Sequence, residues 1–257
     1  MAKKLIDMCK AKTSVVGYRW RLVSSSLLAA CTIMLCAQST PAADEAMILE
    51  HWKVGARQSQ IGNKLIDLLN SMNAHLRYQP SNKQCLFTRG YLYGIVGCTG
   101  MAINDLSKAI QADPYYAAAY AERGICYMDL KNYERARMDL DRAIQLNPRC
   151  GDALFARGKL MLETNRPQAA ISDFRACQSP GVQFCPALPG ELPANYYNGP
   201  EYYLGAAYET VGKTDEALRC YKASIRNPRL GGSGYIHRYS DQPLDAKTRV
   251  SVLDGTY

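Results

Sequence analysis

Small and apolar residues recur at a fixed spacing of 34 positions through the middle of the chain. The matching columns are Gly90, Gly124 and Gly158; Pro80, Pro114 and Pro148; Ala102, Ala136 and Ala170; Leu106, Leu140 and Phe174; Ala109, Ala143 and Cys177; and Tyr93, Tyr127 and Met161. Because six independent columns share one period, the pattern predicts helix–turn–helix units. No single unit can bury its own apolar face, so we expect the units to stack into a solenoid.

These columns resemble the tetratricopeptide repeat (TPR) family, which has small residues at repeat positions 8, 20 and 27, large apolar residues at 4, 11 and 24, and proline near 32. Repeats 1 to 3 then occupy residues 83–178, with starts at 83, 117 and 151, and repeat 4 occupies 198–230. Repeat 2 matches best, at Tyr120, Gly124, Tyr127, Tyr133, Ala136, Leu140, Ala143 and Pro148. The resemblance implies an all-α TPR solenoid of about four repeats.

Three segments lie outside the well-matched repeats. Residues 44–82 carry apolar residues at helical spacing and are predicted to form a helical cap or a degenerate repeat; the sequence leaves both open. Residues 179–199 are rich in proline and are predicted to be a non-helical insertion. Residues 231–257 follow a Gly-Gly-Ser-Gly break and are predicted to be a flexible tail, with a short helix near 243–253 as the alternative.

The first 43 residues resemble a targeting segment. A basic stretch precedes an apolar run at 22–37, which small residues and an acidic start follow. This order predicts a cleaved signal peptide and an exported protein, periplasmic or secreted. Leu28-Ala29-Ala30-Cys31 also resembles a bacterial lipobox, in which Cys31 would be lipidated. An uncleaved membrane anchor is the third alternative.

Composition and charge exclude several classes of protein. Of the 257 residues, 47% are apolar and 21% are charged, which is the balance of a globular protein. The formal net charge is +8, but residues 1–43 supply +5 of it and the other 214 residues only +3. A body that weakly basic predicts no nucleic-acid partner.

The sequence offers little catalytic chemistry. Gly212-Lys213-Thr214 lacks the rest of a phosphate-binding loop and is predicted to be a tight helix–helix turn. The three histidines are far apart, and acids such as Asp139 and Asp141 are expected on solvated helix faces. We therefore expect no catalytic residues, metal or cofactor, and no enzyme activity.

Ten cysteines are present, without a CxxC motif or zinc-type spacing. In an exported protein, Cys185 in the insertion could form a disulfide with Cys177, eight residues earlier. The alternative is that Cys177 is a buried thiol, since it falls at repeat position 27, where alanine normally packs.

The TPR resemblance places the binding surface on the concave face, at positions 2, 5, 9 and 12 of each first helix. The residues we expect there are Phe87, Tyr91, Ile125, Met128, Phe155, Lys159, Leu162 and Tyr202. Phe87 and Tyr91 stand where some TPR domains have the Lys and Asn that grip a peptide carboxylate, so that clamp is absent. Packing against neighbouring helices or the insertion is the alternative role of these side chains.

The function that follows is a non-enzymatic scaffold or assembly factor that binds a protein or peptide segment in the concave groove. One alternative is an outer-membrane lipoprotein or membrane-anchored subunit of an envelope assembly complex. A second is an enzyme or enzyme subunit that uses the cysteine-containing insertion, against which the missing histidine partner of Cys185 argues.

Overall fold

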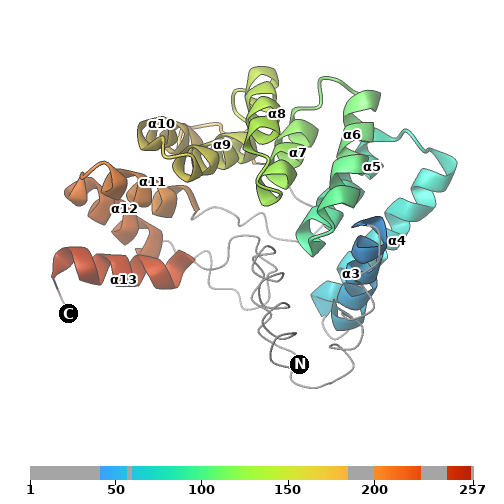
Figure 1. Ribbon diagram of the computed structural model, residues 1–257, viewed down its shortest axis with the longest axis horizontal. Helices are drawn as coiled ribbons and strands as arrows, with labels where there is room; N and C mark the ends of the chain where they lie inside the picture. The colour runs from blue at the N-terminus through green and yellow to red at the C-terminus, as the bar shows by residue number, and fades with distance from the viewer. Residues whose placement is uncertain (1–40, 57–59, 185–198, 227–241, 256–257) are drawn as a thin grey trace, which may run out of the picture.

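The computed structural model describes residues 41–56, 60–184, 199–226 and 242–255, and within these ranges the regular elements are all α-helices. The helices are α3 (Pro41–Ala56), α4 (Gln60–Tyr78), α5 (Lys83–Val96), α6 (Thr99–Ala112), α7 (Ala117–Asp129), α8 (Tyr133–Leu146), α9 (Gly151–Glu163), α10 (Pro167–Cys177), α11 (Gly199–Thr210), α12 (Thr214–Arg226) and α13 (Gln242–Asp254). Consecutive helices pack side by side along an arc (Figure 1). The predicted all-α TPR solenoid is confirmed.

The helix pairs follow the repeat pattern. The pairs α5–α6, α7–α8, α9–α10 and α11–α12 correspond to repeats 1 to 4, and α7 and α9 lie on the inner side of the arc with α8 and α10 outside (Figure 1). The turn within each pair contains a residue with positive φ at repeat position 15: Gly97, Lys131, Asn165 and Gly212, at 88°, 57°, 57° and 77°. The predicted tight turn at Gly212-Lys213-Thr214 is therefore confirmed.

The two helices of each repeat meet at the glycine of position 8, opposite the large residue of position 24. A methyl group on Gly124 would lie 2.9 Å from Leu140 Cγ, and one on Gly158 would lie 2.6 Å from the Phe174 ring. Gly90 with Leu106 and Gly205 with Tyr221 repeat the arrangement. Since real Cβ atoms do not approach other atoms this closely, only glycine permits the observed helix separation.

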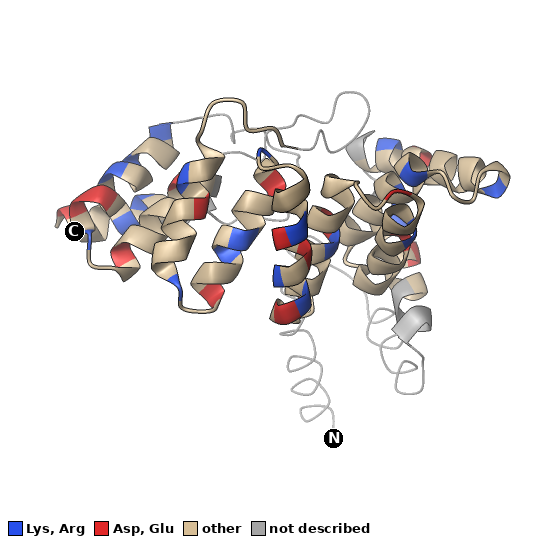
Figure 2. Ribbon diagram, turned by 90° about the horizontal axis from the view of Figure 1, so that it is seen from above, with Lys and Arg blue, Asp and Glu red and all other residues tan. Residues whose placement is uncertain are grey.

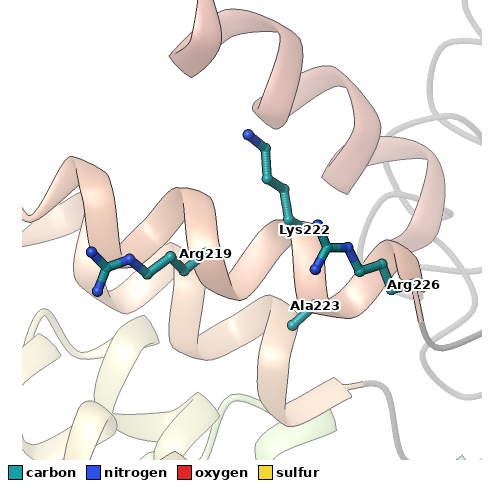
Figure 3. Close-up of a pocket in the computed structure, with 4 residues that line it drawn as sticks. All are labelled: Arg219, Lys222, Ala223 and Arg226. Atoms are coloured by element: carbon teal, nitrogen blue, oxygen red, sulfur yellow. The ribbon is translucent and has the colours of Figure 1, made fainter.

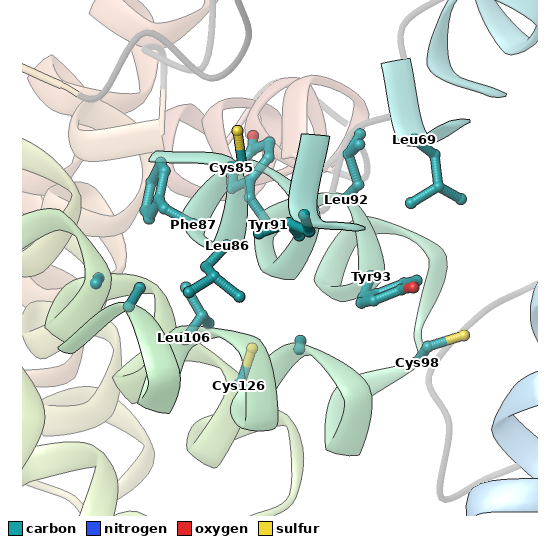
Figure 4. Packing of buried hydrophobic residues seen from close by; sticks show 14 of the residues in the cluster. Leu69, Cys85, Leu86, Phe87, Tyr91, Leu92, Tyr93, Cys98, Leu106 and Cys126 are labelled. Carbon is teal, nitrogen blue, oxygen red and sulfur yellow. The ribbon is translucent and has the colours of Figure 1, made fainter. Parts of the chain in front are cut away.

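The N-terminal helices cover the start of the solenoid. Leu65, Leu69 and Leu76 are buried in one apolar cluster with Leu86 and Leu92 of repeat 1, part of which Figure 4 shows. Helix α3 adds Leu49 to the same cluster and contacts α4, α5 and α6. These contacts fit a capping role and also an imperfect repeat, the two possibilities left open for residues 44–82.

A ladder of arginine–aspartate pairs runs through the repeats. Arg89, Arg123 and Arg157 each donate two hydrogen bonds to an aspartate 16 residues later, over distances of 2.6–2.9 Å. Each arginine also donates a third bond to the second helix of the preceding unit. The pairs and third acceptors are Arg89–Asp105 with Asn73, Arg123–Asp139 with Ser107, and Arg157–Asp173 with Asp141.

The ladder corrects one expectation from the sequence. Asp139 is not on a solvated face but buried, with 7% of its surface exposed, and Asp105 and Asp173 are buried in the same way. Asp141 accepts a hydrogen bond from Arg157. The aspartate hydrogen bond raises the pKa of each of the three arginines, although desolvation opposes it. The charged pairs thus join the two helices of a repeat, and the third bonds of the arginines join each repeat to the preceding unit.

The C-terminal end of the described chain is a capping helix. The sequence favoured a flexible tail over 231–257, but α13 matches the alternative of a short helix near 243–253. It packs on α12 and buries Ala246 completely. Arg249 donates to Glu209 of α11 at 3.0 Å, and Lys222 of α12 pairs with Asp254 at 2.8 Å. The apolar face of the last repeat requires such a cover, and the sequence pattern alone was too weak to predict it.

The predicted insertion begins as an irregular segment that is attached to repeat 3. Gln183 forms a parallel β-bridge with Cys150. The Gln183 N–H donates a hydrogen bond to the Arg149 carbonyl oxygen, and the Gly151 N–H donates one to the Gln183 carbonyl oxygen. Phe184 lies against Gly151, where a Cβ atom would be 2.5 Å from the ring. Cys177 is buried nearby, with its Sγ 3.8 Å from the carbonyl oxygen of Gly151. Cys185 lies outside the described residues, so the Cys177–Cys185 disulfide stays a prediction.

We predict that Gly124→Leu destabilises the solenoid by about 1–3 kcal/mol, because the added side chain must displace Leu140 or separate α7 from α8. Thermal unfolding followed by circular dichroism measures the effect. Gly55→Leu is the matched control, since no atom lies within 4 Å of a Cβ atom at that position. Equal melting temperatures for both variants would contradict the close contact at Gly124.

We predict that Arg123→Met costs about 3–5 kcal/mol of folding stability, because it leaves the buried Asp139 carboxylate unpaired. Urea unfolding measures this loss. The double variant Arg123→Met/Asp139→Leu should recover most of it, since an apolar pair of similar size is often as stable as a buried ion pair. A double variant no more stable than the single one would show that the loss is not caused by the unpaired charge.

We predict that Cys150 resists alkylation by iodoacetamide in the native protein at pH 8, because burial raises the pKa of its thiol to about 12. A raised pKa leaves almost no reactive thiolate below about pH 10. Alkylation in urea without reductant, followed by peptide mapping, provides the unfolded control.

The same map tests the predicted bridge: a Cys177–Cys185 linked peptide is expected, and Cys185 recovered as an alkylated thiol would contradict it.

Candidate protein-binding groove

All eight residues predicted for the groove lie on the first helices of the repeats. Figure 1 shows that α7 and α9, two of these helices, face the inside of the arc. The residues on each helix are Phe87 and Tyr91 on α5; Ile125 and Met128 on α7; Phe155, Lys159 and Leu162 on α9; and Tyr202 on α11. Their exposure divides them into two groups. Phe87, Tyr91, Ile125 and Phe155 are buried, whereas Met128, Lys159, Leu162 and Tyr202 are partly exposed.

The buried aromatic residues at the N-terminal end pack against one another and against a loop. The ring of Phe87 lies 6.4 Å from that of Tyr91 and 5.1 Å from that of Tyr116, which precedes α7. The Tyr116 hydroxyl donates to Gln84 Oε1 at 3.0 Å, and the Lys83 ammonium lies 5.7 Å from the Tyr116 ring centre. These contacts give Phe87 a packing role.

A larger aromatic cluster links repeats 3 and 4. The Tyr203 ring lies 5.4 Å from Phe155 and 5.9 Å from Phe174, while Tyr202 lies 5.5 Å from Tyr221. Lys159 places its ammonium 5.3 Å from the Tyr203 ring centre. Such ring pairs add stability beyond their buried area. The structure thus brings together Phe155, Lys159 and Tyr202 of the predicted groove through Tyr203, which the family's groove positions do not include.

Glu209, on the first helix of repeat 4, accepts hydrogen bonds on both of its carboxylate oxygens from other residues of the chain. The Tyr221 hydroxyl donates to Glu209 Oε2 at 2.7 Å, and Arg249 donates to its other oxygen at 3.0 Å. Burial and this carboxylate both raise the pKa of Tyr221, so its hydroxyl stays protonated and remains a donor. Glu209 therefore connects α11, α12 and α13 and is not an open ligand site.

The described ranges contain no metal centre. No group of three or more His, Cys, Asp or Glu side chains there could hold a metal ion. His75 is exposed, with its Nδ1 2.8 Å from the Ser71 carbonyl oxygen. The possible lipidation site Cys31 and the insertion residue Cys185 lie outside the described residues. Among the helices that the structure describes, none combines the length and hydrophobicity required to cross a membrane.

Two hollows on the surface carry positive charge. The first, of about 450 Å³, is lined by Arg219, Lys222, Ala223 and Arg226 along α12 (Figure 3). Lys222 there is engaged with Asp254. The second, of about 380 Å³, is formed by α4, α5 and α6 and contains Arg77, Arg89 and Lys108. Elsewhere, Figure 2 shows basic and acidic residues interspersed along the helices.

Comparisons with known proteins agree with this geometry. The tetratricopeptide repeat family model matches residues 117–150. Human "Tetratricopeptide repeat protein 13" is 28% identical over 109 residues, which are 42% of this chain and 13% of that protein. A crystal structure of MamA has a TM-score of 0.51 at 22% identity and covers 66% of this chain and 92% of its own. A thermophilic TPR protein from Thermus thermophilus has a TM-score of 0.54 at 15% identity, with coverage of 83% and 98%.

The chain aligns with only a small part of its curated relative, and the solved structures show the likeness of the fold alone. The family match falls on repeat 2, where the sequence pattern is clearest, and the helix pairs on either side continue it at the same 34-residue period. Residues 117–150 are therefore a tetratricopeptide repeat, and the helix pairs around them complete a solenoid of the TPR type, a fold that serves as a scaffold for protein interaction.

Proposed function

We propose that this protein is a non-enzymatic scaffold that binds a protein or peptide segment along the inner face of its repeats. The observation that carries the proposal is the row of partly exposed side chains on successive first helices: Met128, Leu162 and Tyr202. Leu162 and Tyr202 pack against the apolar cluster that contains the buried Phe155. A rigid surface of this kind loses little entropy when it binds an extended or helical segment.

The chemistry of this face favours an apolar partner. Among the eight predicted groove residues only Lys159 is charged, and its ammonium lies over the Tyr203 ring. A partner would therefore gain affinity mainly by burying aliphatic and aromatic side chains against Met128, Leu162 and Tyr202. Residues 1–43, with their signal-like pattern, favour a role for this binding in the assembly of an envelope complex.

We predict that Met128→Glu/Leu162→Glu weakens partner binding by at least about tenfold, since two carboxylates would enter an apolar contact. Both side chains are partly exposed, so the fold should survive. The assay is a crosslinking pull-down from the native cell, in which the partner captured by the unmodified protein is quantified for each variant. Replacing the buried Tyr91 and Phe155 by Ala should also reduce binding, but it removes core packing at the same time.

The matched control is Leu130→Glu/Met138→Glu. It makes the same chemical changes at positions that are 57% and 63% exposed and lie outside the row of groove residues. The control should capture the partner as well as the unmodified protein does. If both double variants capture it equally, the partner docks elsewhere and the assignment of the groove is wrong.

A further inference from the structure

The hollow between α4, α5 and α6 combines positive charge with an apolar wall. Its lining is Asn73, Leu76, Arg77, Pro80, Leu86, Arg89 and Lys108, which includes three cations and no acidic residue. Leu76 and Leu86 are 8% and 2% exposed and belong to the main core cluster. The hollow therefore offers a fixed apolar surface beside cationic groups.

The three cations differ in how they are held. Arg89 is fixed by Asp105 and by the Asn73 side chain at 2.9 Å, which uses three of its five N–H groups. Arg77 and Lys108 are exposed, and neither has an ion-pair partner among the described residues. Because Asp105 balances the charge of Arg89, the hollow retains about two uncompensated positive charges.

The internal repeat provides a comparison within the same chain. Adding 34 to each residue number gives the equivalent positions between repeats 1 and 2, where Gln111 replaces Arg77 and Tyr120 replaces Leu86. Tyr120 there stacks with Arg123, whose guanidinium lies 5.6 Å from the ring centre, and its larger side chain adds bulk at the position of Leu86.

Between repeats 2 and 3 the equivalent residues are Gln145 for Arg77, Ala176 for Lys108 and Asp141 for Asn73. Asp141 adds a carboxylate, which accepts a hydrogen bond from Arg157 at 2.8 Å. The first junction, between α4 and repeat 1, thus has the cations Arg77 and Lys108 and the neutral amide Asn73. The third junction, between repeats 2 and 3, has two uncharged residues and an acid at these positions. Between repeats 1 and 2, Arg142 keeps a cation at the position of Lys108, but neither of the other two junctions has a cation at the position of Arg77. The repeat scaffold itself does not require the charge of Arg77.

We propose that this hollow is a second interaction site, on the outer layer of the solenoid, for an acidic side chain that lies next to an apolar residue in a protein partner. The carboxylate would lie between Arg77 and Lys108, and the apolar neighbour would contact Leu76, Leu86 and Pro80. Charged donors form the strongest hydrogen bonds to carboxylates, and Arg89 supplies further N–H groups in a fixed position. This site does not depend on the inner groove.

The test uses leucine-methyl NMR of the full chain, because Leu76 and Leu86 report directly on the hollow. The probe is the dipeptide N-acetyl-Leu-Glu-amide, and its uncharged counterpart is N-acetyl-Leu-Gln-amide. We expect saturable shifts of both leucines with a dissociation constant in the millimolar range, as suits so small a ligand, and at least about tenfold weaker binding of the glutamine peptide. Equal binding of the two peptides would overturn the proposal.

The variant Arg77→Gln/Lys108→Ala installs residues that the chain already has at its third junction, so the fold should be retained, as an unchanged melting temperature would verify. We expect it to lose at least about tenfold in affinity for the glutamate peptide. The control Arg137→Gln/Arg142→Ala removes two exposed charges from α8 and should bind normally. An equal loss in the control would show general electrostatic attraction and would overturn the proposed site.

Two further probes identify the source of the anion. N-acetyl-Leu-Leu with a free C-terminal carboxylate presents a chain end, and inorganic phosphate presents a different anion. We expect both to bind more weakly than the glutamate peptide. Tighter binding of either one would overturn the assignment to an acidic side chain and would identify a chain-end or phosphate site instead.

Discussion

The close approach of two helices at a glycine is the constraint on which the rest of this structure depends. At position 8 of every repeat the second helix leaves little or no room for a Cβ atom, and the large residue at position 24 fills the contact. This separation fixes where the arginine of position 7 emerges and allows it to reach the aspartate of position 23 in the same repeat. The third bond of that arginine then sets the register with the preceding unit. Packing within a repeat and stacking between repeats are therefore coupled.

The sequence predicted the apolar side of this arrangement well and the polar side poorly. Gly90, Gly124 and Gly158 are periodic and chemically distinctive, so the helix pairs and their turns could be predicted. The arginine and aspartate columns have the same 34-residue period, and this shared period was the sequence signal that could have predicted the buried pairs. Asp139 was nevertheless expected in solvent, because an isolated acid on a helix is usually exposed. Only the simultaneous period of Arg123 and Asp139, 16 residues apart, identifies the buried pair.

The groove was harder to predict, because exposure depends on neighbours that are distant in sequence. The family positions placed Phe87 and Met128 on the same face, yet one is buried and the other partly exposed. Phe87 owes its packing partly to Tyr116, which lies in a loop between repeats. The aromatic cluster around Tyr203 and the capping helix α13 likewise arise from contacts between units. A pattern within one repeat carries no information about such contacts.

The arginine ladder stops before repeat 4, where Leu204 occupies position 7 and Cys220 position 23. The junction between repeats 3 and 4 is formed instead by ring contacts around Tyr203. At the other junctions the third hydrogen bond of a ladder arginine ties one unit to the next, whereas the described contacts between repeats 3 and 4 are ring and apolar packing. The mechanical stiffness of the solenoid is therefore uneven along its length. Among the described residues, a change in curvature at the junction of repeats 3 and 4 would break no hydrogen bond of the arginine ladder, so bending strain would concentrate there.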